Sequence, residues 1–417
     1  TERSVDIIGT FDVCVVGGGF AGVAAALAAA RNGASVCLLE KTCSLGGLGT
    51  LGLVVDYLPL CDGKGHKLIG GIGEELLKKV SKYDMSSPPD CWKDGEYCGP
   101  NGIEPPRYEL TYNPNAMVLL MEELLIDDKV TIFYDTLVCN VVKTDNKISE
   151  VIIENKSGRS AVSAKTVIDA SGDADVCKLS GEVTVESHDN VCAWWFYSQD
   201  EKGVHLNRKS DNFYKITDDT KTFSGTDSKD VSALCIETRN RIRAFITASR
   251  TGDQSFAGRE MSHDGSEVID EAIPSQPQIP LLLPTIPQFR MTRRLTSENE
   301  LTEDNMKQWS DTCIGIVGDW RKRGPAYSIP FEALLCKTDN LLTAGRCIPA
   351  SGSAWDITRV IPVCAVTGEA AGTAAAIAAE TSEGMMSRIS VSKLQEKLTK
   401  QKVILNEEPF HYFLHMK

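Results

Sequence analysis

Three glycines near the N-terminus have the spacing of a site for a phosphorylated cofactor. Gly17, Gly19 and Gly22 form a G-x-G-x-x-G pattern directly after the apolar run 12–16. The first glycine permits a tight turn, the second lets a pyrophosphate approach the backbone, and the third lets the next helix pack on the strand. That helix offers unpaired N–H groups and the positive end of its dipole to phosphates. The alternative is a turn with only a structural role.

An acidic residue supports the cofactor interpretation. Glu40 directly follows the strand-like run 35–39. In dinucleotide sites an acidic residue is expected about 20 residues after the glycines, which agrees with this position. Its carboxylate can accept hydrogen bonds from ribose hydroxyls and would repel a 2′-phosphate. Glycines and acid together predict a dinucleotide site.

A cluster of arginines is the best candidate for substrate chemistry. The stretch "QFRMTRR" brings Arg290, Arg293 and Arg294 together on a segment that reads as extended. Because side chains alternate along an extended chain, Arg290 and Arg294 share one face and Arg293 takes the other. Two guanidinium groups on one face can hold a carboxylate. A solvated basic face is the alternative.

The elements around these residues predict an α/β fold. Residues 12–39 read as strand, glycine turn, alanine-rich helix and strand, and the glycine loop "SLGGLGTLG" follows. Residues 130–169 alternate as short strands joined by "TDNK" and "NKSGR", a β-meander that ends in the apolar strand "TVIDAS". Such a buried strand is expected to rejoin a parallel sheet.

The composition changes between residues 186 and 323, which predicts an inserted domain. The motif "AWWFYS" there is either an aromatic wall for a planar substrate or a strand core. We therefore expect a Rossmann-like domain with a β-meander, plus an inserted α+β substrate or cap domain. The first domain is expected over 1–60, 113–185 and 324–380, an irregular excursion over 61–112, the inserted domain over 186–323, and a helical tail over 381–417.

Composition limits the class of protein. The chain has 417 residues, of which 42% are hydrophobic and 24% charged, as in ordinary globular proteins. A net charge of −13 argues against a general nucleic-acid surface. Its 14 cysteines include no C-x-x-C pair, which favours reduced thiols and a cytoplasmic protein, although Cys91 and Cys98 would be able to pair in an oxidising compartment. No metal site and no membrane span are predicted.

The surroundings of the glycine motif resemble one flavoprotein superfamily. The second glycine loop from Gly46, the meander and the returning "NLLTAGRC" with its alanine-rich helix are similar to FAD-dependent oxidoreductases of the glutathione-reductase type. The segments 292–305 and 327–376 resemble the branch of fumarate reductase and succinate dehydrogenase flavoproteins. The resemblance covers the first 60 residues, about 130–180 and about 288–380. It implies FAD as the cofactor.

The resemblance also implies where FAD binds. Glu40 would hold the adenosine ribose, the backbone of Val138 would meet adenine, and Gly47 and Thr50 would lie beside the flavin ring. The N-terminus of the last helix would face the flavin pyrimidine and stabilise negative charge on reduction. The full set of implied FAD contacts is Gly17, Gly19, Phe20, Ala21, Gly22, Glu40, Lys41, Gly46, Gly47, Thr50, Val138, Ala170, Ser171, Gly172, Asp173, Gly345, Arg346, Val360, Ile361 and Pro362.

The loop "CIPASGSAWDITRV" would lie at the active site in such a fold. Trp355, Asp356 and Arg359 join Arg290 and Arg294 as catalytic candidates. Many relatives have a histidine in this loop, and this chain has none. His66 and His263 remain as the internal histidine candidates, and a lone loop histidine is more often a surface residue. The C-x4-C spacing of disulfide reductases is absent.

These observations favour an FAD-dependent dehydrogenase or reductase. The predicted reaction transfers a hydride between flavin N5 and a small organic substrate, with a carboxylate as the candidate group. The second G-x-G-x-x-G of the chain, Gly47, Gly49 and Gly52, lies in the glycine loop assigned to the flavin, and no further one is present for NAD(P)H, so another protein, a quinone or oxygen is the expected electron partner. The alternatives are a flavin-dependent RNA-modifying enzyme and a non-catalytic FAD-binding partner subunit. The acidic composition points away from RNA.

Overall fold

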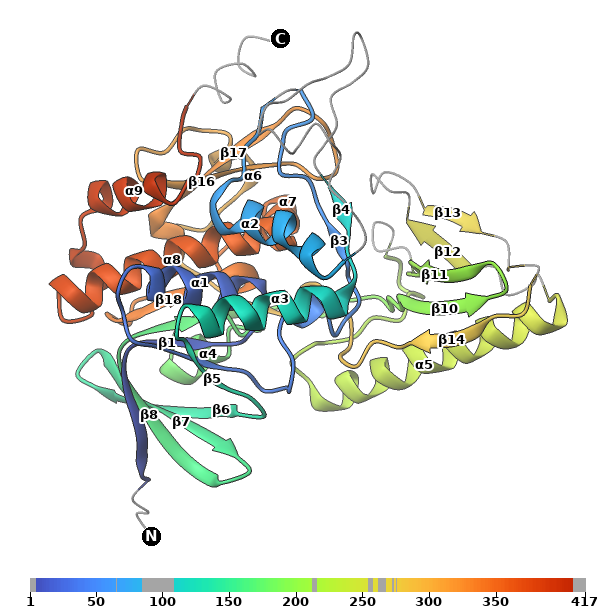
Figure 1. Ribbon diagram of the computed structural model, residues 1–417, viewed down its shortest axis with the longest axis horizontal. Coiled ribbons are helices and arrows are strands. Elements are labelled where there is room, and N and C mark those ends of the chain that lie inside the picture. The colour runs from blue at the N-terminus through green and yellow to red at the C-terminus, as the bar shows by residue number, and fades with distance from the viewer. Residues whose placement is uncertain are drawn as a thin grey trace. The chain divides into compact units, whose positions relative to one another are not determined.

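The computed structural model describes residues 5–64, 66–84, 109–211, 216–253, 258–261, 268–271, 274 and 276–407 (Figure 1). The chain divides into two compact units. The first unit comprises Thr1–Gly46, Val55–Val185 and Arg294–Lys417. The second comprises Gly47–Val54 and Glu186–Arg293.

The first unit begins with the strand–helix–strand motif. Strand β1 (Ile7–Val16) runs parallel to β2 (Val36–Leu39), and α1 (Phe20–Arg31) connects them. The last four residues of β1 and all of β2 are buried, as expected for strands inside a parallel sheet. Helix α1 ends at Asn32, and Gly33 follows with a φ of +89°, a conformation that suits glycine.

One seven-stranded sheet forms the centre of the first unit. Its order is β5-β2-β1-β8-β7-β6, and β18 also pairs with β8. Strands β5, β2, β1, β8 and β18 run parallel, whereas β6, β7 and β8 form the antiparallel meander. Strand β8 belongs to both the meander and the parallel part of the sheet, so it is the strand through which the meander rejoins the parallel sheet. The bounds are β5 (Thr131–Phe133), β6 (Leu137–Thr144), β7 (Lys147–Asn155), β8 (Gly158–Asp169) and β18 (Leu341–Thr343).

Helix α8 (Ile361–Thr381) packs along α1 (Figure 1). A Cβ on Gly368 would lie 2.1 Å from the carbonyl oxygen of Ala21, and one on Gly372 would lie 2.0 Å from that of Ala25. Only glycine allows this approach. Helix α8 is long and apolar enough to cross a membrane, but 89% of its apolar window is buried within the structure, as in a core helix.

Shorter elements complete the first unit. The helices are α2 (Gly71–Lys79), α3 (Pro114–Asp127), α4 (Asp175–Ser180), α6 (Glu303–Met306), α7 (Gly352–Thr358) and α9 (Val391–Lys400). The 3-10 turns are η2 (Val80–Lys82), η4 (Phe331–Leu334), η5 (Gly345–Cys347) and η6 (Met386–Arg388). The paired strands are β3 (Asp56–Tyr57) with β4 (Leu110–Thr111) and β16 (Cys313–Gly318) with β17 (Ala326–Pro330).

The second unit packs a small sheet against one long helix. Strands β10 (Phe196–Asp200), β11 (Gly203–Asn207) and β14 (Ile279–Leu282) form a sheet in the order β11-β10-β14. Helix α5 (Ser228–Thr251) is capped by Asp227 and contributes Phe245 to a core with Trp194 and Phe196. The turn η1 (Gly47–Gly49) and the hairpin β12 (Gly258–Met261) and β13 (Val268–Glu271) also belong here. Two boundaries between the units fall within strands. One follows Val185 in β9 (Thr184–Glu186), and the other follows Arg293 in β15 (Arg293–Leu295).

The unit boundaries differ from the expected domains in two places. Residues 294–323 belong to the first unit, whereas the sequence predicts a return at 324. The reason is that β16 pairs with β17 and packs on α8, where a Cβ on Gly315 would lie 2.2 Å from Val366. Residues 47–54 belong to the second unit, although a glycine loop after the second strand reads as part of the first. Most of the predicted excursion, 85–108, lies outside the described residues.

Candidate functional site

The glycine turn forms an open cradle at the end of β1. Gly17 has a φ of +99°, and a Cβ there would lie 2.5 Å from the carbonyl oxygen of Ala170. A Cβ on Gly22 would lie 1.7 Å from the carbonyl oxygen of Gly17. A Cβ on Gly19 would meet no protein atom within 4 Å. The first and third glycines are thus required by the fold, and the second leaves space over the turn.

Glu40 is fixed beside this cradle. Its Oε2 accepts a 2.7 Å hydrogen bond from the N–H of Gly18, and its Oε1 accepts from the N–H and the hydroxyl of Thr42, both at 2.8 Å. The side chain is 6% exposed. Each carboxylate oxygen has more than one lone-pair direction, so a ribose hydroxyl can still donate to it.

Neighbouring segments bring further predicted FAD contacts to the cradle. Gly46 donates its N–H to the carbonyl oxygen of Gly18 at 2.8 Å. The N–H of Thr136, two residues before Val138, donates to the carbonyl oxygen of Glu40 at 3.0 Å. Val138 therefore lies on the strand that starts beside the acid. Gly47 and Thr50 belong to the second unit.

The carboxyl end of β8 supplies a charged cluster. Asp169 accepts hydrogen bonds from the hydroxyl of Ser171 at 2.6 Å and from the N–H of Cys177 at 2.9 Å. Asp173 lies 3.4 Å from Nη2 of Arg346 and 3.7 Å from Nζ of Lys41. Arg346 also lies against Gly172, where a Cβ would be 2.6 Å from Nη2. The structure brings these predicted contacts together from three separate segments.

Helix α7 gathers most of the catalytic candidates of the first unit. Arg294 lies over the ring of Trp355, with Cζ 5.4 Å from the centroid, and pairs with Glu300 at 2.9 Å. Arg359 pairs with Asp356 on the same helix. The indole of Trp355 donates to the carbonyl oxygen of Arg346 at 3.1 Å, which joins α7 to the cluster at β8.

Two buried guanidinium groups here each have a donor without an acceptor. Nε of Arg294 and Nε of Arg359 are buried and lack a hydrogen-bond partner among the residues that the structure describes. The side chains are 10% and 9% exposed. A buried N–H that lacks an acceptor costs roughly 1–3 kcal/mol. An acceptor-rich ligand would remove this cost.

A network of ion pairs and hydrogen bonds that contacts α7 was not identified from the sequence. Arg321 pairs with Asp319 at 2.9 Å and with Asp356 at 3.6 Å, and the indole of Trp320 donates to the carbonyl oxygen of Asp356 at 3.1 Å. Burial raises the pKa of Asp319, but the hydrogen bonds from Arg321 outweigh it and hold the pKa below its usual value. No local pattern in "GDWRKRG" marks these residues, because Asp356, the residue that joins them to α7, lies more than thirty positions away.

Glu303 extends this network. The hydroxyl of Ser353 donates to it at 2.5 Å, and the ammonium of Lys307 lies 3.1 Å away. The hydrogen bond from Ser353, with Lys307 and Lys322 nearby, lowers the pKa of Glu303 to about 2. The carboxylate is therefore ionised across the physiological range.

Arg290 lies in the second unit and Arg294 in the first. Cζ of Arg290 is 5.7 Å from the centroid of Trp195. The predicted clamp of Arg290 with Arg294 stays a prediction. Arg293 pairs with Glu186 at 3.5 Å.

The histidine candidates divide between described and undescribed parts of the chain. His66 contacts the buried carboxylate of Asp62, with Nδ1 2.7 Å from Oδ2. His263, Cys91 and Cys98 lie outside the described residues. No group of three or more metal-ligating side chains gathers within the described ranges.

The site fits FAD by two observations on its helices. Helices α1 and α8 both begin without a side-chain cap, at Gly19 and Val360. Their first N–H groups are therefore not taken by a capping side chain, and the space at Gly19 allows a pyrophosphate to approach. Val360, Ile361 and Pro362 form the first turn of α8, the end that carries partial positive charge.

The comparison with protein families identifies the chain's family. The family described as "FAD dependent oxidoreductase" matches residues 12–192 and 183–398. The chain therefore belongs to this family of FAD-dependent oxidoreductases, and FAD is its cofactor. The expected α/β fold with a parallel sheet is confirmed. No curated protein matches the sequence.

Solved structures with a similar arrangement are distant in sequence. A geranylgeranyl bacteriochlorophyll reductase-like protein from Thermoplasma acidophilum is 13% identical over 98% of this chain and 96% of that chain, with a TM-score of 0.48. The open conformation of a flavocytochrome c3 fumarate reductase is 13% identical over 89% and 79%, with a TM-score of 0.41. The myxobacterial FAD-dependent chondrochloren halogenase is 13% identical over 94% and 79%, with a TM-score of 0.44. These similarities are too distant to specify a substrate.

Proposed function

We propose that this oxidoreductase transfers a hydride between flavin N5 and a small organic substrate that carries a carboxylate, as a dehydrogenase or reductase of the fumarate reductase and succinate dehydrogenase type. FAD supplies the hydride acceptor or donor in such a reaction. The electron partner is part of the proposal: another protein, a quinone or oxygen. A cytoplasmic location likewise remains a prediction from cysteine usage.

The observation that carries the proposal is the unsatisfied donor on Arg359. Its Nη2 is held by Asp356, so the guanidinium is fixed, while Nε is buried and has no acceptor in the described part of the chain. Arg359 directly precedes Val360, the residue that starts α8. A carboxylate bound there would receive a charge-assisted hydrogen bond next to the positive end of the helix.

Arg294 supports the same reading from a second segment. It is anchored by Glu300 and by the ring of Trp355, and its Nε also has no acceptor among the described residues. A guanidinium group does not lose its proton in this pH range. Both arginines therefore act by binding and orienting an anionic group, and they exclude neutral analogues.

Anaerobic rapid mixing of the FAD-loaded protein tests this function. The oxidised protein is mixed with succinate and lactate, and the reduced protein with fumarate, while the flavin absorption is followed. We expect one of these carboxylates to reduce or reoxidise the flavin. Arg359→Lys should lower kcat/KM at least tenfold with FAD still bound, because lysine cannot place a donor at Nε. The exposed Arg388→Lys is the matched control and should have no effect.

Two results would overturn the proposal. The first is tightly bound FAD that no carboxylate reduces or reoxidises, which would favour a non-catalytic FAD-binding subunit. The second is wild-type kinetics in the Arg359→Lys variant.

A further inference from the structure

We infer that the second unit contains a carboxylate-binding site built on the indole of Trp195 and the guanidinium groups of Arg208 and Arg290. The inference rests on the carboxylate chemistry of the proposed function and concerns the second unit alone, where it names residues that would bind a carboxylate separately from Arg359 and Arg294. It also assigns a role to Trp195, which the sequence leaves between an aromatic wall and a strand core.

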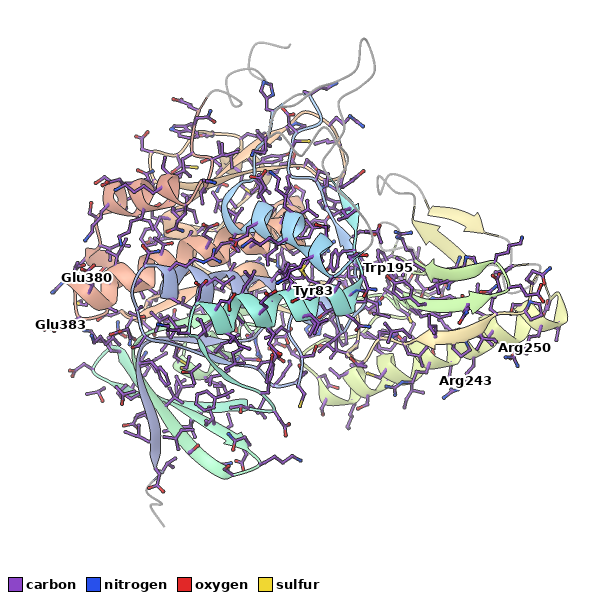
Figure 2. The ribbon with its side chains drawn as sticks, viewed as in Figure 1. Tyr83, Trp195, Arg243, Arg250, Glu380 and Glu383 are labelled. Atoms are coloured by element: carbon purple, nitrogen blue, oxygen red, sulfur yellow. The ribbon has the colours of Figure 1, made fainter. Side chains whose placement is uncertain are left out.

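Trp195 is a buried donor without an acceptor. The residue is 4% exposed, and its Nε1 has no hydrogen-bond partner within the described ranges (Figure 2). Its neighbour Trp194 behaves differently. Trp194 stacks on Phe196 with ring centroids 6.1 Å apart and packs edge-on against Phe245. Packing in the aromatic core thus accounts for the burial of Trp194, whereas it does not account for the unsatisfied N–H of Trp195.

Two cations lie over the ring of Trp195. Cζ of Arg208 is 5.8 Å and Cζ of Arg290 is 5.7 Å from the ring centroid. A cation over an indole face is favourable by about 0.5–2 kcal/mol. This attraction holds both guanidinium groups close to the unsatisfied N–H.

Trp195 is tied to the loop that the family resemblance places beside the flavin. Gln288 is 2% exposed, and its Oε1 accepts a 3.2 Å hydrogen bond from the N–H of Trp195. The Nε2 of Gln288 donates to the carbonyl oxygen of Gly52. Gly52 and the predicted flavin contacts Gly47 and Thr50 lie on one short segment of this unit.

Both arginines are carried by fixed backbone. The Oδ1 of Asn190 accepts hydrogen bonds of 3.1 Å from the N–H groups of Arg290 and Met291. Arg208 directly follows β11, and the next residue, Lys209, accepts a 2.8 Å backbone hydrogen bond from Trp194. The site is therefore ordered before a ligand arrives, which reduces the entropy lost on binding.

The chemistry of these groups selects an anion that only accepts hydrogen bonds. An indole N–H and a guanidinium group are donors without acceptor capacity. A carboxylate can accept from the unsatisfied indole N–H of Trp195 and carries a charge opposite to that of the two guanidinium groups, whereas a primary amide of the same shape is neutral and would turn its own N–H groups toward these donors. Inorganic phosphate has the same acceptor chemistry, so the test must separate it from a carboxylate.

Calorimetric titration of the FAD-loaded protein tests the site with acetate, succinate, benzoate, benzamide and inorganic phosphate. At least one carboxylate should bind, and benzoate should bind more tightly than benzamide. Trp195→Phe keeps an aromatic ring, although a smaller one, and removes the N–H, and we expect at least tenfold weaker carboxylate binding, as we do for Arg208→Gln. Trp309→Phe in the first unit and Arg250→Gln on α5 are matched controls and should stay within twofold of wild type.

A direct readout of the indole completes the test. With ¹⁵N-labelled tryptophan, one N–H resonance that is missing in Trp195→Phe should move downfield when a carboxylate binds. Unchanged carboxylate affinity in Trp195→Phe, equal affinity for benzamide, tighter binding of phosphate than of every carboxylate, or no binding of any carboxylate would each overturn the inference.

The outcome is separable from that of the proposed function. Carboxylate binding that depends on Trp195 without any flavin turnover would support the site and contradict the proposed reaction. Flavin turnover that depends on Arg359, together with no carboxylate binding that depends on Trp195, would do the reverse.

Discussion

The carboxylate of Glu40 accepts a 2.7 Å hydrogen bond from the backbone N–H of Gly18, in the middle of the glycine turn. The acid at the end of β2 therefore shapes the cradle at the end of β1. The same side chain also fixes Thr42, so one carboxylate joins the glycine turn to the segment 40–42. Loss of Glu40 should disturb the cradle itself as well as any contact with the ribose.

Glu40→Gln should weaken FAD binding at least tenfold. The amide would turn an N–H₂ group toward the backbone N–H of either Gly18 or Thr42, and each of these groups can only donate. Lost charge-assisted hydrogen bonds typically cost about 1.5–3 kcal/mol. Fluorescence titration of the apoprotein with FAD measures the change. Glu380→Gln, at an exposed position on α8, should bind FAD as wild type does. Equal affinities in the two variants would contradict the role of Glu40.

Two glycine-to-alanine substitutions should separate cofactor binding from folding. Gly19→Ala adds a methyl group that meets no protein atom, so the apoprotein should keep its melting temperature while FAD binding falls. Gly368→Ala places its methyl group 2.1 Å from the carbonyl oxygen of Ala21 and should force α1 and α8 apart. Overpacking of this kind costs typically 1–3 kcal/mol or more. Thermal unfolding of both apoproteins distinguishes the two cases, and an unchanged melting temperature in Gly368→Ala would refute the close contact.

The buried carboxyl of Glu369 should make stability depend on pH. It accepts hydrogen bonds from the N–H of Ile72 at 2.8 Å and from Gln401 at 2.9 Å, but burial dominates and raises its pKa to about 7. The folded state then holds a proton that the unfolded chain releases near 4.5. Stability from this group is full below the unfolded value and is lost as pH rises through about 7.

Glu369→Gln provides the measurement. The free energy of unfolding of wild type should fall between pH 5 and 8 by an amount on the order of 2 kcal/mol from this residue. The variant should lose that part of the slope, as judged by urea unfolding at several pH values. A wild-type slope in the variant would show that Glu369 does not titrate in this window.

Removal of the negative charge next to Arg359 should raise the reduction potential of the flavin. Asp356 pairs with Arg359 and lies 3.6 Å from Arg321. Asp356→Asn leaves these cations less compensated at the start of α8, where they would favour the anionic reduced flavin. Spectroelectrochemical titration measures the potential. The control Asp304→Asn, at a position where the side chain is 96% exposed, should leave it unchanged. A potential in Asp356→Asn equal to or below that of wild type would argue against a flavin at this end of α8.

The cofactor half of the protein was predictable because its signals are local. The strand, turn, helix and strand of residues 12–39 each follow from a few consecutive residues, and the alternating meander follows from a period of two. The glycines of α8 also signal close packing, and the structure supplies their partners on α1. The α/β fold could therefore be deduced before any contact was known.

The residues proposed to bind substrate, and those that support them, were less predictable because their contacts are distant in sequence. Arg290 and Arg294 read as a pair, but the boundary between units falls between them. Trp195 depends on Gln288 and Gly52, which lie on two other stretches of the chain. Asp319 and Arg321 show no periodic pattern, and only the fold reveals that they support α7. Side-chain pairings of this kind carry no local sequence signal.

The assignment of residues 47–54 to the second unit bears on how the protein is made and how its parts can be exchanged. This segment leaves the ribosome well before residues 186–293. The second unit can therefore complete its fold only after the later residues have been synthesised. A fragment of 186–293 alone would lack the carbonyl oxygen of Gly52 that Gln288 binds. The second unit therefore cannot be exchanged as the single segment 186–293: any chimera that transplants it must carry the early glycine segment as well.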